Sequence, residues 1–376
     1  MRPPSAAGVR PPCAPRPGGA PGALVGVDLG GTKIAAALVG PDGALRSATL
    51  RAPTPARHGP GAVLDAVADL VERVVAGAAA PGRPVRPAAV GIGSAGVIDA
   101  ERGVVLSATD AIVGWTGTDV AGGVSERLAA AGVRAPDGAA PLVHVDNDVN
   151  AHAAGEARFG AGRGRSSALV VAVGTGVGAA LVLDGRIHHG AHFLAGEMGH
   201  MPCGEAQGET CTCGRPGHLE AVAAGPQIAR RYRRAAGDET VTGAVQVERL
   251  AEAGDAVARR VYRQAALALG RALAGAVTVL DPEAVIVSGG LARSGGLWWG
   301  PLRRTLRGEL VDLVAERIEI LPAALGGAAP IIGAAHEARL RLARAPGPAR
   351  PGTGPGTTPG PGPGIDPDIR PRQEAP

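Results

Sequence analysis

ALVGVDLGGTKIAAALV at residues 23–39 and ALVVAVGTGVGAALVL at residues 168–183 follow the same plan. In each stretch an apolar run of strand length leads into a turn of Gly and Thr, and a second apolar run follows. An Asp-Gly pair, at 42–43 and again at 184–185, then predicts a hairpin turn. The repetition indicates two similar α/β halves, each with a Gly-rich hairpin near its start, around a nucleotide cleft.

The rest of the chain alternates between expected strands and expected helices. Further strands are expected at 44–50, 88–92, 142–145 and 284–287. Helices are expected at 62–79, directly after residue 148, and at 218–235, 244–253, 255–280 and 301–314. We therefore expect an α/β protein with a small lobe at 23–150, completed by a helix at about 330–344, and a large lobe at 151–329.

Composition restricts the class of protein. The 376 residues are 45% apolar but only 2% aromatic, so the core is expected to consist of Ala, Val, Leu and Ile. The net charge is +4, but the Arg residues are scattered, which argues against a nucleic-acid partner. We find no signal peptide and no apolar run long enough to span a membrane, and expect a soluble, cytoplasmic protein. The Pro-rich tails at 1–22 and 345–376 are predicted to be disordered.

The two Gly-rich turns have the chemistry of phosphate-binding loops. Without a Cβ, their backbone N–H groups can approach phosphate oxygens closely, and the Thr hydroxyls add donors. Asp28 could hold a Mg²⁺ ion or its bound water. Neither turn matches the P-loop or dinucleotide pattern, so another nucleotide-binding architecture is expected. The candidate nucleotide-binding residues are Asp28, Gly30, Gly31, Thr32, Lys33 (the only Lys in the chain), Gly174, Thr175, Gly176, Gly178, Gly289 and Gly290.

Asp146, Asn147 and Asp148 end the expected strand at 142–145, between the two halves. A carboxylate in this place could accept the proton of a hydroxyl group that attacks a phosphorus atom. Asp and Asn are also the preferred residues at a helix N-cap, and for these three residues alone that explanation is the better one. Asp146 and Asp148 share one face of an extended strand, so periodicity does not choose between them.

His200, Cys211, Cys213 and His218 lie within nineteen residues and have the ligand types of a closed, structural zinc site. Cys203 is a nearby thiol that could compete as a ligand. Three further histidines lie upstream with a less suitable spacing: His188, His189 and His192. A zinc ion here would fix a loop with little apolar content, together with the two acids that flank it, Glu197 and Glu220.

Six motifs together resemble those of the ROK family of sugar kinases, and they occur in the same order across about residues 24–340. They are DLGGTK at 28–33, DNDVNAHAAGE at 146–156, GTGVGAALVLDG at 174–185, GEMGH at 196–200, CTCGRPGHLEA at 211–221 and VIVSGGLA at 285–292. The resemblance implies an actin-like ATPase fold of the hexokinase type. It also implies transfer of the γ-phosphoryl group of ATP to the 6-hydroxyl of a hexose, most readily glucose, with Mg²⁺ and structural zinc. A homodimer or homotetramer is expected.

The same resemblance assigns roles to individual residues. Asp148 would be the catalytic base and Asn147 a sugar ligand. Glu197, His200 and Glu220 would bind the remaining hydroxyls, and His200 would use one ring nitrogen for zinc and the other for the sugar. The turns at 30–33 and 174–178 would hold the ATP phosphates, and Gly289-Gly290 would lie near the adenosine.

Two departures from the family pattern concern the zinc and the sugar. His218 replaces the third zinc cysteine of the family, which leaves two His and two Cys as ligands. The segment TDAIVGW at 109–115 keeps Gly114 and Trp115 but lacks the Asn and Pro of glucokinases. A kinase for N-acetylmannosamine or N-acetylglucosamine is therefore the alternative. A sugar-responsive repressor is disfavoured, because the 27 residues before Asp28 contain no recognition helix.

Overall fold

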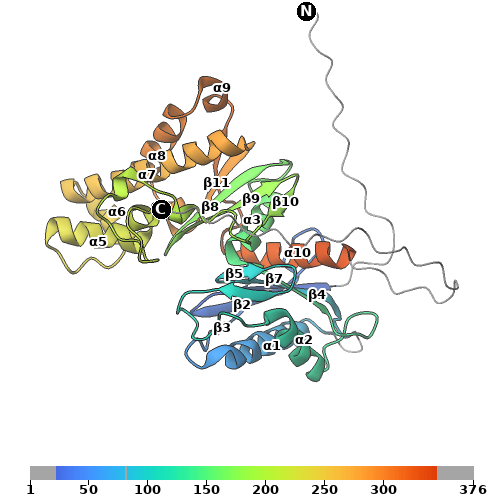
Figure 1. Ribbon diagram of the computed structural model, residues 1–376. Coiled ribbons are helices and arrows are strands. Elements are labelled where there is room, and N and C mark those ends of the chain that lie inside the picture. The colour runs from blue at the N-terminus through green and yellow to red at the C-terminus, as the bar shows by residue number, and fades with distance from the viewer. Residues whose placement is uncertain (1–22, 81–82, 345–376) are drawn as a thin grey trace, which may run out of the picture. The chain divides into compact units, whose positions relative to one another are not determined.

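Two five-stranded sheets organise the protein, for which a computed structural model describes residues 23–80 and 83–344 (Figure 1). The first sheet has the order β3-β2-β1-β4-β7, and the second has the order β10-β9-β8-β11-β12. The strands of the first sheet are β1 (Ala23–Leu29), β2 (Lys33–Val39), β3 (Leu50–Pro53), β4 (Pro87–Ser94) and β7 (Leu142–Asn147). Those of the second are β8 (Ala168–Val173), β9 (Val177–Leu183), β10 (Arg186–His188), β11 (Ala284–Ser288) and β12 (Glu319–Pro322). A separate hairpin pairs β5 (Val97–Asp99) with β6 (Val104–Ser107).

The two sheets have the same topology, which confirms the predicted repeat. In each, the first strand pairs antiparallel with the second across the Gly-rich turn, and the second pairs antiparallel with the third. In each, the first strand also pairs parallel with the fourth, and the fourth pairs parallel with the fifth. Both Gly-rich turns therefore occupy the same position in their sheets, between the first strand and the second.

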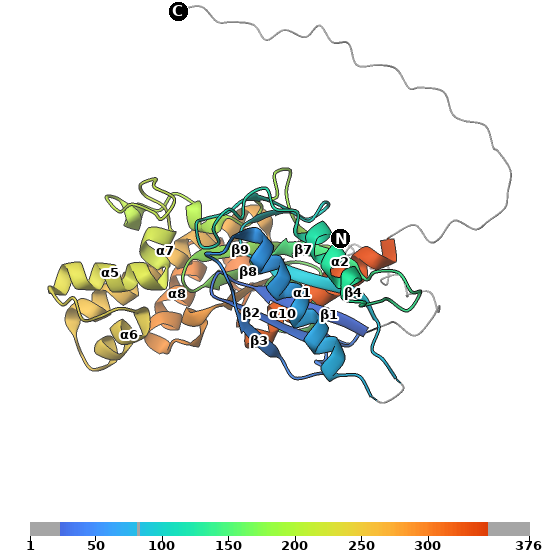
Figure 2. The same ribbon diagram turned by 90° about the horizontal axis from the view of Figure 1, so that it is seen from below.

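Helices cover both faces of each sheet (Figures 1 and 2). On the first sheet, α1 (Gly59–Gly77) and α2 (Val120–Ala130) cover one face, and α10 (Ala329–Arg344) covers the other. On the second sheet, α3 (Asp148–Phe159) covers one face. The helices of the other face form a layered block with α9 at its edge: α4 (Glu220–Ala223), α5 (Gly225–Ala236), α6 (Ala244–Glu252), α7 (Ala256–Leu280), α8 (Gly296–Gly308) and α9 (Asp312–Ala315).

Residue size decides which helices lie on which face of the first sheet. Val27 and Ile92 point into the core that the sheet shares with α1 and α2. The alternate positions Gly26 and Gly91 face α10, whose backbone lies directly on them. A Cβ on Gly91 would lie 1.8 Å from the carbonyl oxygen of Ala334. The backbone of the helix can therefore come this close to the sheet only at positions without a side chain.

Replacing Gly91 with Ala is expected to lower the free energy of unfolding by about 2–3 kcal/mol, because α10 must move away from the sheet to admit the methyl group. Thermal or urea unfolding of the purified variant measures this loss. Gly77→Ala is the matched control: Gly77 ends α1, and a Cβ there meets nothing within 4 Å. Equal stability of the two variants would contradict this account of the contact.

Three predicted boundaries were wrong. The third strand begins at Leu50, because the Ser47 hydroxyl accepts the Leu38 N–H at 3.0 Å and interrupts the ladder before it. The helix expected at 218–235 is two helices, because the ring of Pro226 cannot continue the helix from α4. The helix expected at 301–314 spans 296–308, where the buried Trp298, Leu302 and Leu306 recur every fourth residue.

The two tails predicted to be disordered lie outside the described residues. The boundaries expected for the two lobes remain a prediction. Within 23–80 and 83–344, no helix combines the length and hydrophobicity needed to cross a lipid bilayer.

Candidate active site

Asp148 stands where the first sheet passes into α3. It is the first residue of that helix, and Asn147 is the N-cap. The Asn147 Oδ1 accepts the N–H groups of Val149 at 2.8 Å and Asn150 at 3.2 Å, and its Nδ2 donates to the Gly96 carbonyl at 2.9 Å. Among the described residues, no acceptor takes the second N–H of the Asn147 amide, so this donor is left for a ligand. Asn147 is thus the helix cap and keeps one amide donor for a ligand.

Asp146 and Asp148 differ in how their carboxylates are used. Asp146 is 1% exposed, and its Oδ1 accepts the Asn147 N–H at 2.7 Å and the Asn150 Nδ2 at 2.9 Å. Its Oδ2 lies 2.8 Å from the Nε2 of His189. The carboxylate of Asp148 receives only the N–H of Val149, at 2.9 Å, from the described residues. Asp148 therefore has the free acceptor oxygen that a base requires.

The electrostatic surroundings of Asp148 make it a stronger base than an ordinary carboxylate. Burial, followed by the negative charges of Asp28 and Glu197, raises the pKa of Asp148 to about 6, although hydrogen bonds from the backbone oppose the shift. Burial also raises the pKa of Asp28, although Lys33 opposes that shift. Three candidate residues distant in sequence therefore lie close enough to influence one another.

The first Gly-rich turn is closed by its own backbone and supported from β3. Gly30 N–H donates to the carbonyl of Lys33 at 3.0 Å. Thr54 holds both ends, since its hydroxyl donates to the Gly30 carbonyl at 2.7 Å and its N–H donates to the Thr32 carbonyl at 3.1 Å. Thr32 and Lys33 are exposed at the tip of the turn. The supporting role of Thr54 was missed, because no local pattern links it to a turn more than twenty residues earlier.

The second Gly-rich turn brings several elements to the start of α3. Gly174 N–H donates to the Gly176 carbonyl at 2.9 Å, and Thr175 is exposed at the tip. A Cβ on Gly178 would lie 3.1 Å from the side chain of Val149, which follows Asp148 directly. On its other side the turn meets the glycines after β11: a Cβ on Gly174 would lie 3.8 Å from the N of Gly290, and one on Gly289 would collide with β8.

Glu220 connects this second turn to the predicted zinc loop. Its Oε2 accepts the N–H of Val177 at 3.0 Å, and its Oε1 accepts the hydroxyl of Thr212. Thr212 lies between two of the predicted ligands, Cys211 and Cys213. One carboxylate is therefore bonded to the second Gly-rich turn and to the loop that a metal would organise.

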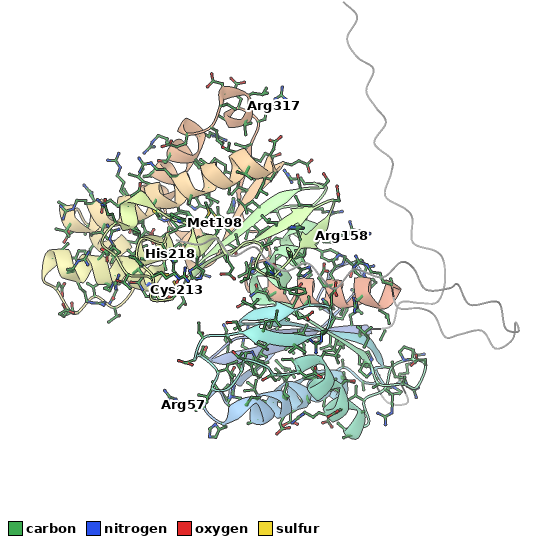
Figure 3. All side chains as sticks on the ribbon, viewed as in Figure 1. Arg57, Arg158, Met198, Cys213, His218 and Arg317 are labelled. Atoms are coloured by element: carbon green, nitrogen blue, oxygen red, sulfur yellow. The ribbon has the colours of Figure 1, made fainter. Side chains whose placement is uncertain are left out.

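The structure brings the four predicted zinc ligands together. One ligand atom from each of His200, Cys211, Cys213 and His218 lies within 4.8 Å of the others. Cys213 Sγ lies 3.3 Å from His218 Nδ1, and Cys211 Sγ lies 3.8 Å from His200 Nδ1. Figure 3 labels Cys213 and His218 near one another on the half that carries α5. Such spacings suit bonds of about 2.0–2.3 Å to one central ion in tetrahedral geometry.

The contacts around this cluster show whether Cys203 belongs to it and where each ring nitrogen of His200 points. The thiol of Cys203 is outside the cluster and donates to Glu205 Oε2 at 3.2 Å. In His200, Nδ1 faces the cysteine, while Nε2 lies 3.6 Å from Glu197 Oε2. His200 therefore turns one nitrogen to the metal cluster and the other to a candidate sugar-binding acid.

The segment that departs from the glucokinase pattern lies beside the first turn. A Cβ on Gly31 would lie 3.1 Å from the Cβ of Ala111. Trp115 is 1% exposed, and its Nε1 donates to the hydroxyl of Ser94 at 3.3 Å, with Ser94 at the end of β4. Gly114 has a positive φ of 70°, which favours glycine. The Gly-Trp pair thus anchors the loop beside the first Gly-rich turn.

Comparison with known proteins agrees with this geometry. The family model described as the ROK family matches residues 24–340. The chain belongs to the ROK family. A glucokinase of Thermotoga maritima is 31% identical over 331 residues, which cover 85% of this chain and 98% of that protein.

Two solved ROK structures share the fold. The ROK hexokinase of Thermus thermophilus has a TM-score of 0.73 and 34% identity, and the match covers 85% of this chain and 99% of that one. The ROK family glucokinase of Streptomyces griseus, solved with glucose and AMPPNP, has a TM-score of 0.68 and 32% identity over 85% of this chain and 100% of that one. The ROK chain described here therefore has the actin-like ATPase fold of the ROK hexokinases, as predicted.

Proposed function

We propose that this ROK protein is an ATP-dependent hexose kinase that transfers the γ-phosphoryl group to the 6-hydroxyl of a sugar, most readily glucose. The observation that carries the proposal is Asp148, a base with a pKa of about 6 at the start of α3, next to the second Gly-rich turn. The names of the full-length glucokinase relatives support glucose as the acceptor.

In the proposed reaction, Asp148 accepts the proton of the 6-hydroxyl while that oxygen bonds to the γ-phosphorus. The bond between the γ-phosphorus and the bridging oxygen breaks, and its electron pair leaves with ADP. A pKa of about 6 leaves Asp148 ionised at pH 7.5 while making it more basic than an exposed carboxylate. The carboxylate contributes mainly by orienting and deprotonating the hydroxyl at the moment of transfer.

The remaining candidates would hold the two substrates. Glu197, His200 Nε2, Glu220 and the second N–H of Asn147 would bind the other hydroxyls of the sugar. The N–H groups and hydroxyls of the turns at 30–33 and 174–178 would bind the ATP phosphates, and Gly289-Gly290 would lie near the nucleoside. Asp28 suits Mg²⁺, since it is a hard oxygen ligand and its negative charge raises the pKa of the nearby Asp148. A divalent cation would supply charge neutralisation there.

Zinc is proposed as a structural ion held by His200, Cys211, Cys213 and His218, because their ligand atoms already cluster. Four protein ligands would leave no open position for a substrate. The ion would cross-link the loop at 200–218, which has few apolar residues to stabilise it. The loop carries His200 itself and, through Thr212, fixes the carboxylate of Glu220.

An ADP-release assay over glucose, mannose, fructose, N-acetylglucosamine and N-acetylmannosamine tests the proposal. Glucose is expected to give the highest kcat/KM, and 6-deoxyglucose should give no ADP above background because it lacks the attacking hydroxyl. A higher kcat/KM for an N-acetylated sugar would replace glucose with the alternative acceptor. No sugar-dependent ADP release from zinc-containing protein with Mg²⁺ would overturn the proposed function.

A further inference from the structure

A hydrogen bond between His189 and Asp146 joins the two sheets, and the mechanism above does not use it. The Nε2 of His189 lies 2.8 Å from the Oδ2 of Asp146. His189 follows β10 of the second sheet directly, whereas Asp146 lies near the end of β7 in the first sheet, two residues before Asp148. The side chain of Asp146 is 2% exposed and that of His189 is 27% exposed. In such a shielded position a charged pair is screened little by solvent.

His189 also begins the segment that leads to Glu197. Its carbonyl accepts the N–H of Ala195 at 3.1 Å, which closes residues 189–195 into a tight loop. The far end of that loop is held on β9, since the Gly196 carbonyl accepts the N–H of Ala179 at 2.9 Å. Glu197 follows Gly196 directly, so this closed loop connects the residue that bonds to Asp146 with a candidate sugar-binding acid.

The partner of His189 is equally connected to the base. Asp146 Oδ1 accepts the backbone N–H of Asn147 and the side-chain amide of Asn150, on either side of Asp148. One oxygen of Asp146 thus binds residues on either side of Asp148. Its other oxygen contacts His189, in the loop that leads to Glu197.

We propose that His189 is a positioning residue for phosphoryl transfer, which holds Glu197 in register with Asp148 through its hydrogen bond to Asp146. The inference rests on the proposed function and adds a determinant of sugar affinity to it. Weakening the His189–Asp146 bond should lower the affinity for the sugar and leave the affinity for ATP unchanged, because the loop from 189 to 197 leads to a sugar-binding group. The phosphate-binding turns are held by other contacts, those of Thr54 and of Gly225.

The charges that surround His189 favour its protonated form. The hydrogen bond to Asp146 raises the pKa of His189, partial burial opposes the shift, and the charges of Asp146 and of Glu337 on α10 raise it further, as does Glu101 in the turn between β5 and β6. The protonated ring donates a charge-assisted hydrogen bond, which is stronger than the bond from a neutral ring. The sugar KM should therefore rise as the pH increases through the raised pKa of His189.

Steady-state kinetics between pH 6.5 and 9, with the best sugar of the panel, test the inference on the zinc-containing enzyme. In His189→Ala the sugar KM is expected to rise about tenfold or more, the worth of a charged hydrogen bond, with the KM for ATP nearly unchanged. In His189→Gln the amide can replace the Nε2–H donor but does not titrate, so the sugar KM should be intermediate and independent of pH. His188→Ala, at the exposed neighbouring position, is the matched control and should behave as wild type.

Two results would overturn the inference alone. One is an active wild type whose sugar KM is unchanged by His189→Ala, even if the variant unfolds at a lower temperature. The other is a sugar KM in His189→Gln that follows the same pH curve as wild type. Absence of sugar-dependent ADP release from the wild type would overturn the proposed function and this inference with it.

Discussion

Asp148→Asn is expected to lower kcat by about 10²–10⁴-fold on the best sugar, with a much smaller change in the sugar KM. Asn has the size and hydrogen-bonding shape of the carboxylate, so the sugar can still be bound. It cannot accept the proton of the attacking hydroxyl, and that loss appears only in the transition state. Initial rates at saturating ATP and varied sugar measure both constants.

Asp146→Asn is the matched control and is expected to keep most of the kcat. Its Oδ1 can still accept from Asn147 and Asn150, and the new amide can donate to a neutral His189 ring. Asp146 is also almost completely buried, so its carboxylate does not reach a substrate. A larger loss of kcat in Asp146→Asn than in Asp148→Asn would overturn the assignment of the base.

The pKa of Asp148 adds a pH dependence and a stability check to the same experiment. The kcat of the wild type should fall as the pH decreases through about 6, because the base becomes protonated. The folded pKa is raised above 3.8, so the folded state binds this proton more tightly than the unfolded chain does. Ionised Asp148 therefore destabilises the fold progressively between pH 3.8 and about 6, and fully above that range. Asp148→Asn removes this cost, so its Tm at pH 8 should equal or exceed that of the wild type.

Cys211→Ser is expected to remove the zinc and to lower the free energy of unfolding by more than about 4 kcal/mol. Wild-type protein purified without chelators should contain about one zinc per chain, as a four-ligand structural site requires. Cys211 is 4% exposed, and the serine hydroxyl that replaces its thiol is not among the usual ligands of structural zinc. Elemental analysis gives the zinc content, and thermal unfolding with and without a chelator gives the stability.

Cys203→Ser is the control for this prediction, because Cys203 lies near the cluster but bonds to Glu205. It should retain the zinc, whereas His218→Ala should lose it. Loss of zinc in Cys203→Ser with retention in His218→Ala would show that the ligand set is wrong. Zinc-free wild-type protein would contradict the site as a whole.

Local sequence patterns predicted the two similar α/β halves of this ROK chain. The repeated strand, Gly-Thr turn and strand at 23–39 and 168–183 predicted the two sheets, because period-two alternation and the φ freedom of glycine act over a few residues. Proximity in the sequence also identified the cluster of His200, Cys211, Cys213 and His218. The same reasoning misplaced the helix at 218–235, because a Pro inside an apolar helical pattern was read as part of one helix.

Tertiary structure decided between residues that look alike in the sequence. Asp146 and Asp148 share a strand pattern. Both oxygens of Asp146 are hydrogen-bonded, to Asn147, Asn150 and His189. Asp148 keeps an acceptor oxygen and lies near the charges of Asp28 and Glu197. His189 has no local motif at all; its partner lies 43 residues earlier, and only the packing of β7 against the loop after β10 brings the pair to 2.8 Å. The sequence alone gives the chemical type of the side chain at each position. Which groups are buried, and which charges they meet there, depends on contacts between distant segments, and these set both the pKa values and the hydrogen bonds that remain for a substrate.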